Sequence, residues 1–176
     1  MILRKVNAVL SLITTLLFLD HAIFQAVHML SEGGIKQSAS FMPYILTVTM
    51  ILHALLSIVL AILGHKGADK RKCKAYPKLN IATNIQRISG VLLILLTALH
   101  ISEMTGRLQL PPAIYLILTP LFFAVALMHV AVSTSKAFIT LGIGNAKTVK
   151  AVDIVMKILC AATLIADVVG FYLYLF

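Results

Sequence analysis

The chain has 176 residues, of which 60% are hydrophobic and 12% are charged, and its mean hydropathy is +1.00. This composition excludes an ordinary soluble domain, which carries about twice the share of charged residues. The net charge of +9 does not indicate a nucleic-acid partner, because the basic residues fall in short segments between apolar runs rather than along one polar face. The sequence therefore predicts a multi-pass integral membrane protein.

Five apolar runs are long enough to cross a hydrocarbon core of about 30 Å, which takes roughly 20 helical residues. The segments between them, such as "SEGGIKQSAS" and "EMTGRLQLPP", hold the Gly, Pro, Ser and charged residues that end helices or solvate turns. We therefore expect an all-α membrane protein, with a single domain over 1–176 built as a bundle of five transmembrane helices. In chain order these helices lie near 6–30, 43–64, 86–105, 112–135 and 151–175.

The basic residues alternate between the two sides of this predicted bundle. One side has only Lys36 and Arg107 in its loops. Because cytoplasmic loops of membrane proteins carry an excess of Lys and Arg, we expect a cytoplasmic N-terminus and a C-terminus outside. The basic residues on the predicted cytoplasmic side are Arg4, Lys5, Lys66, Lys70, Arg71, Lys72, Lys74, Lys78, Arg87, Lys136, Lys147 and Lys150.

Four histidines lie inside the predicted spans, at two depths. With a helical rise of about 1.5 Å per residue, His21 and His100 both fall roughly 20 Å from the cytoplasmic side. His53 and His129 fall within roughly 10–16 Å of it. Imidazole is a common iron ligand, and a six-coordinate haem b takes two, one on each face of the macrocycle. The two depths therefore favour two stacked haems, an inner one on His53 and His129 and an outer one on His21 and His100.

Two alternatives stay open at this point. The histidines are also compatible with buried polar residues bonded to backbone carbonyls, or with a proton path in a haem-free protein. His28 lies two helical turns beyond His21 on the same face, at the outer boundary, so it is an alternative ligand of the outer haem, a contact for a quinone head group, or, as we favour, a side chain that reaches water. Ionisable residues are costly in lipid and need a functional reason, and a set of four favours haem over the other interpretations.

Further polar residues accompany each level. Gln86, Arg87 and Ser89 begin the third helix at the cytoplasmic boundary, where a haem propionate or a quinone carbonyl can reach them. The planar guanidinium of Arg87 suits the carboxylate of a propionate. Quinone chemistry moves protons together with electrons. Three carboxyl groups in the outer half are therefore candidates for proton transfer, namely Asp20, Glu103 and Asp167.

Three segments resemble helices of a known family. "NIQRISGVLLILLTALHISEMTG" is similar to the third helix of the five-helix dihaem cytochrome b membrane subunit of succinate:quinone oxidoreductases and quinol:fumarate reductases. "LHALLSIVLAILGHKG" and "LMHVAVSTSKAFITLGI" resemble its second and fourth helices, and the likeness in helix order and spacing covers nearly the whole chain. The resemblance assigns His53 and His129 to the haem nearest the iron–sulfur subunit, and His100 with His21 to the distal haem.

The resemblance also implies what the chain does and what surrounds it. The expected role is a membrane anchor and electron conduit, a subunit without the succinate site, since the chain has no dinucleotide-binding glycine fingerprint and no iron–sulfur cysteine cluster. The implied cofactors are two haem b, with a quinone, menaquinone, as substrate. The implied partners are a flavoprotein subunit and an iron–sulfur subunit in a bacterial or archaeal cytoplasmic membrane, with a homodimer of the complex. The alternative is a stand-alone transmembrane dihaem cytochrome b with other redox partners.

Overall fold

The computed structural model describes residues 2–31, 41–65 and 77–175, and all regular structure in these ranges is helical. It contains five helices that are long and apolar enough to span a membrane. The all-α fold and the five membrane-length helices are thereby confirmed for the described residues. Lys36 and the basic loop 66–76, on which the predicted orientation partly depends, lie outside them. The helices are α1 (Ile2–Leu30), α2 (Met42–His65), α4 (Pro77–Met104), α5 (Pro112–Leu141) and α6 (Ala146–Leu175).

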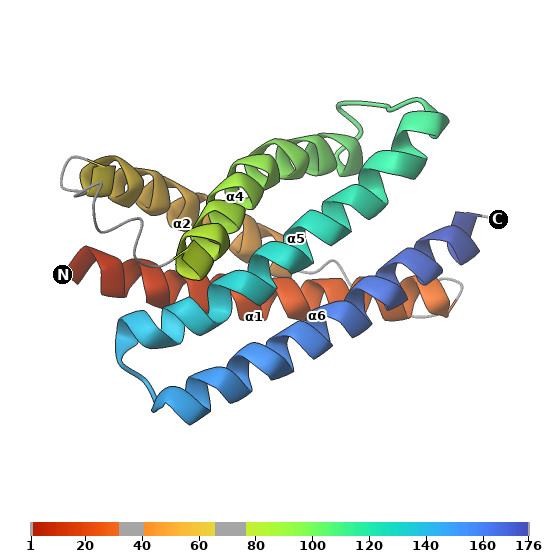
Figure 1. Cartoon of the computed structure of the whole chain (residues 1–176). Helices are drawn as coiled ribbons and strands as arrows, with labels where there is room; N and C mark the ends of the chain where they lie inside the picture. Colours follow the sequence, from red (N-terminus) through yellow and green to blue (C-terminus); the bar gives the residue numbers. More distant parts are fainter. Residues whose placement is uncertain (1, 32–40, 66–76, 176) are drawn as a thin grey trace.

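The packed centre of the bundle is formed by α1, α5 and α6. Its buried side chains are Leu19, Leu127, Val130 and Cys160, one or two from each of these helices. On the flanks, α2 packs against α1 and α4 packs against α5. The helices run in alternating directions, so the two termini lie at opposite ends of the bundle (Figure 1). Many large apolar side chains point outward, as expected where lipid rather than water surrounds the protein.

The ends of α5 and α6 show why the helices extend beyond the predicted apolar spans. Helix α5 continues until Gly142, whose φ of 74° is left-handed and suits a residue without a Cβ; its N–H bonds the carbonyl of Ile139 at 3.2 Å. Helix α6 starts directly after Asn145, whose Oδ1 accepts the backbone N–H of Thr148 at 3.0 Å. Capping residues set these ends, whereas hydropathy detects only the part of a helix that lies in lipid.

A proline inside α5 is compensated by a neighbouring helix. Pro120 has no N–H, so the carbonyl of Leu116, four residues earlier, loses its helical partner. The hydroxyl of Tyr172 on α6 donates to that same carbonyl at 3.3 Å. In lipid no water is present to satisfy a free carbonyl, and a side chain from an adjacent helix takes over this role.

Replacing Tyr172 with phenylalanine should therefore destabilise the fold by about 0.5–1 kcal/mol, the range of interhelical hydrogen bonds in membranes. Unfolding in mixed detergent micelles measures the change. Tyr174→Phe on the same helix is the control, since Tyr174 makes no such bond to α5. In a Pro120→Ala background, where the backbone N–H of residue 120 again reaches the Leu116 carbonyl, the substitution should cost less; an equal cost in both backgrounds would contradict the pairing.

Candidate functional site

The inner pair of histidines comes together from two different helices. His53 lies on α2 and His129 on α5, and the two imidazoles are close enough for their charges to interact. In the described part of the chain, α2 packs extensively only against α1, so the backbones of α2 and α5 stay apart. Two imidazoles brought near each other from separated helices suit a group that takes one imidazole on each of its faces.

The ring of His129 is held against α4. Ser89, only 1% exposed, places its Oγ 2.8 Å from Nδ1 of His129. A Cβ added to Gly90 would lie 3.3 Å from Cε1 of the same ring, which is tighter than ordinary van der Waals contact. The Ser-Gly pair of "QRISG" thus contacts the inner histidine directly. Sequence reasoning missed this contact, because it depends on how α4 lies against α5.

Of the three buried polar atoms that lack a hydrogen-bond partner in the described part of the chain, two lie on the helices that carry the inner pair, and the third is Oγ1 of Thr14 on α1. Nδ1 of His53 is buried and accepts or donates no hydrogen bond among the described residues, and the same holds for Oγ of Ser133, one helical turn past His129 on α5. An unsatisfied buried polar group costs about 1–3 kcal/mol, and native structures contain few of them. These two atoms lie on the two helices that carry the inner pair, so they fit a site that a polar ligand completes.

A hydrogen bond between α1 and α2 orients the helix that carries His53. Nδ2 of Asn7 on α1 donates to Oγ of Ser57 on α2 at 3.1 Å. Ser57 follows His53 by four residues, so the two lie on the same face of α2. The bond therefore sets the rotation of α2 about its axis, and with it the direction in which His53 extends.

Beyond the inner pair, α4 and α5 bring polar and basic side chains together. Nζ of Lys136 donates to Oε1 of Gln86 at 2.9 Å, and Arg87 is close enough to Lys136 for their charges to interact. Lys136 follows His129 by seven residues, two turns along the same face of α5. Two cations and an amide suit an anionic group such as a carboxylate. Sequence reasoning used Lys136 only for orientation, although its spacing from His129 was a usable signal.

The outer pair is formed by α1 and α4. His21 and His100 are close enough for their charges to interact, and the ring of His100 stacks on Phe122 of α5 with centroids 4.9 Å apart. His28 lies further along α1, where its ring centroid is 6.4 Å from that of Tyr174 near the end of α6. The structure thus brings His21 beside His100 and places His28 beside Tyr174.

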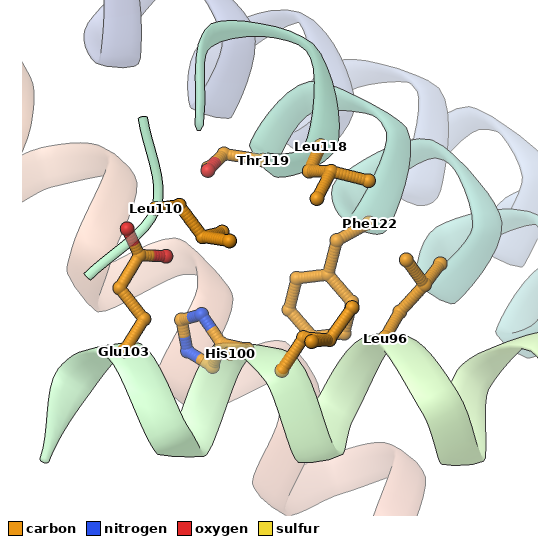
Figure 2. Close-up of a pocket in the computed structure, with 8 residues that line it drawn as sticks. Leu96, His100, Glu103, Leu110, Leu118, Thr119 and Phe122 are labelled. Atoms are coloured by element: carbon orange, nitrogen blue, oxygen red, sulfur yellow. The ribbon is translucent and has the colours of Figure 1, made fainter. Parts of the chain in front are cut away.

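A small cavity opens next to His100 (Figure 2). Its volume of about 20 Å³ is enough for roughly one water molecule. Glu103 and Thr119 bring their oxygen atoms to it from α4 and α5, so a water there has polar partners (Figure 2). The rest of the wall is apolar and consists of Leu96, Leu99, Leu110, Leu118 and Phe122.

The three candidate carboxyl groups lie on three different helices. Asp20 on α1 is exposed, and its charge interacts with that of the adjacent His21. Glu103 on α4 is partly buried at the small cavity. Asp167 on α6 is 2% exposed and forms no hydrogen bond or ion pair with the described residues. Asp20 directly precedes His21, and Glu103 follows His100 by three residues on α4. Within the described ranges, no hydrogen bond or ion pair joins the three carboxyl groups to one another.

The imidazoles gather in pairs rather than in larger clusters. Across residues 2–31, 41–65 and 77–175, no three His, Cys, Asp or Glu side chains form a group that could hold a bare metal ion. A pair of imidazoles is nevertheless a complete protein ligand set when a macrocycle supplies the other iron ligands. No family model, curated protein or solved structure matches the chain.

Proposed function

We propose that the chain is the membrane anchor and electron-transfer subunit of a succinate dehydrogenase or fumarate reductase, and that it carries two haem b groups. The observation that carries the proposal is that His53 lies close enough to His129, and His21 to His100, for their charges to interact, each pair between separate helices. Ser89, at the inner pair, and His100, in the outer pair, are eleven residues apart on α4. The two levels are thus roughly 16 Å apart along that helix.

The surroundings of the inner pair support haem as its ligand. Nδ1 of His53 is buried without a hydrogen-bond partner among the described residues, so no other protein group occupies this nitrogen and it is available to iron. Bound there, haem b supplies one-electron redox chemistry. The chain's own residues would hold it: the imidazoles of His53 and His129 would bind its iron, and we assign its propionates to Arg87 and Lys136, with Gln86 orienting the lysine.

The charge of the bundle supports an orientation and a docking side. Arg4 and Lys5 lie at the start of α1, Lys147 and Lys150 at the start of α6, and Lys136 near the end of α5, and these helix ends share one end of the bundle (Figure 1). Arg87 and Lys157 lie further along α4 and α6, and Arg107 follows the end of α4. We place the basic end in the cytoplasm of a bacterium or archaeon. The iron–sulfur and flavoprotein subunits dock there in this proposal, and the complex forms a homodimer.

The outer level is where we place quinone chemistry. The cavity beside His100 offers the Glu103 carboxyl and the Thr119 hydroxyl to a water molecule, which suits proton delivery to a reduced quinone, menaquinone in this proposal. Asp20, next to His21, and the buried Asp167 on α6 are the further proton-transfer groups. Oγ of Ser89 lies 2.8 Å from Nδ1 of His129, so we assign Ser89 to this imidazole rather than to a propionate or the quinone.

An absorption spectrum of the purified chain tests the proposal. We expect b-type haem bands with two haems per chain, because each histidine pair provides both axial ligands. A properly folded chain without b-type haem would overturn the proposal. Isolation from the native membrane tests the partners: co-purifying flavoprotein and iron–sulfur subunits support the anchor role, and a haem-loaded chain without them indicates a stand-alone cytochrome b.

One observation favours a second function, a haem-free proton-relay protein. Asp167 is buried in the membrane-spanning part of α6 and has no partner among the described residues, as a carboxyl that binds and releases protons would be. In that case replacing His53 or His129 leaves the visible spectrum unchanged. The haem proposal expects the loss of one haem from either substitution.

A further inference from the structure

The contact between α4 and the inner histidine bears on which ring nitrogen of His129 carries the proton. The hydroxyl of Ser89 donates to the backbone carbonyl of Gln86, one turn earlier, at 3.2 Å. When the hydroxyl proton of Ser89 is donated to Gln86, Oγ can act only as an acceptor toward Nδ1 of His129, which lies 2.8 Å away. The arrangement is satisfied when Nδ1 carries the proton and donates it to Ser89.

The surroundings of the ring support this assignment. The backbone carbonyl of Gln86, which accepts from Ser89, also lies near the His129 imidazole, and a carbonyl oxygen only accepts. The Nδ1–Cε1 edge of the ring faces α4, with Cε1 3.3 Å and Nδ1 3.8 Å from the position of a Cβ on Gly90. In the neutral ring, Nε2 is then left unprotonated with a free lone pair.

We propose that Ser89 is the positioning residue of His129, which fixes the proton on Nδ1 and presents Nε2 to the iron of the inner haem. The inference rests on the proposed function and adds a difference between the two haems. A hydrogen bond accepted from the far N–H of an imidazole orients the ring and strengthens its donation to the metal. Ser89 therefore stabilises the ferric state and holds the potential of the inner haem down.

The outer pair has no equivalent of this bond. The ring of His100 stacks on Phe122, and neither His100 nor His21 forms a hydrogen bond with the described residues. A stacked aromatic ring restricts rotation but accepts no proton from Nδ1. The effect of Ser89 is thus expected at one haem only, which gives each experiment an internal reference.

Redox titration of the haem-loaded full chain tests the proposal. Ser89→Ala should raise the midpoint potential of the inner haem, leave that of the outer haem unchanged, and shift the low-spin ferric resonance signal of the inner haem. Ser89→Thr keeps the hydroxyl and should behave as the wild type. Thr134→Val is the matched control, since Thr134 is equally buried but bonds only the Val130 carbonyl of its own helix. An inner potential and resonance signal unchanged in Ser89→Ala would overturn the proposal.

If Ser89→Ala does not accumulate, a measurement on the wild-type chain tests which nitrogen of His129 carries the proton. In the full chain without haem, nitrogen-15 magnetic resonance of labelled histidine, assigned with His129→Gln, should show the proton of His129 on Nδ1. A proton on Nε2 would refute the inference. A wild-type chain that folds but never binds haem would instead refute the proposed function, so the two failures are distinguishable.

Discussion

Replacing His129 with alanine should remove the inner haem and leave the outer one bound. Alanine offers no donor atom to iron, and a six-coordinate haem b that loses one of its two axial imidazoles is no longer held at its site. The outer pair uses α1 and α4, so it keeps both of its ligands. The haem-to-protein ratio of the purified variant, from its reduced spectrum, should fall from two to one, and His53→Ala should give the same result.

The control for this substitution is Met128→Ala, on the same helix and directed outward with 44% of its surface exposed. It should retain both haems. Unchanged haem content in both histidine variants would contradict the inner pair as ligands. Loss of only one haem in each, with the same residual spectrum, would show that His53 and His129 serve one site.

Replacing each of the two histidines of α1 in turn shows which of them is a ligand of the outer haem. His21→Ala should remove the outer haem, because His21 is the histidine of α1 whose charge interacts with that of His100. His28→Ala should retain both haems, because its ring lies beside Tyr174, at the end of α6. Haem stoichiometry and the spectrum of the remaining haem measure the outcome. The opposite pattern would make His28 the ligand and place His21 outside the site.

A positive control completes this comparison. His100→Ala removes the other proposed axial ligand, so its residual spectrum should match that of His21→Ala. Agreement between these two variants and disagreement with His129→Ala would establish that the four histidines divide into the two proposed pairs. Identical spectra for all of them would contradict the division.

Much of the fold could be predicted from local properties of the chain. Five membrane-length helices follow from runs of apolar residues, because a helix in lipid must satisfy its own backbone and hydropathy reports this directly. The helix ends were harder to place. Helix α4 begins at Pro77, well before its apolar part, because the helix continues into polar sequence that hydropathy does not mark.

The candidate site was accessible to sequence reasoning only in part. Counting residues along alternating helices put His53 level with His129 and His21 level with His100, since depth depends only on position in a regular helix. The same counting left His21 and His28 as competitors, because both lie on one face of α1. The structure distinguishes them by their surroundings: His21 is close enough to His100 for their charges to interact, and the ring of His28 lies 6.4 Å from that of Tyr174.

By itself, the sequence determined a five-helix membrane protein with four histidines at two depths. These features depend on composition and on the periodicity of single helices. Only the tertiary structure decided that Ser89 and Gly90 contact the ring of His129, that Lys136 binds Gln86, and that Tyr172 satisfies the carbonyl freed by Pro120. The physical reason is that each of these contacts joins two helices. Their rotation and offset are set by the packing of the whole bundle, and no local stretch of sequence encodes them.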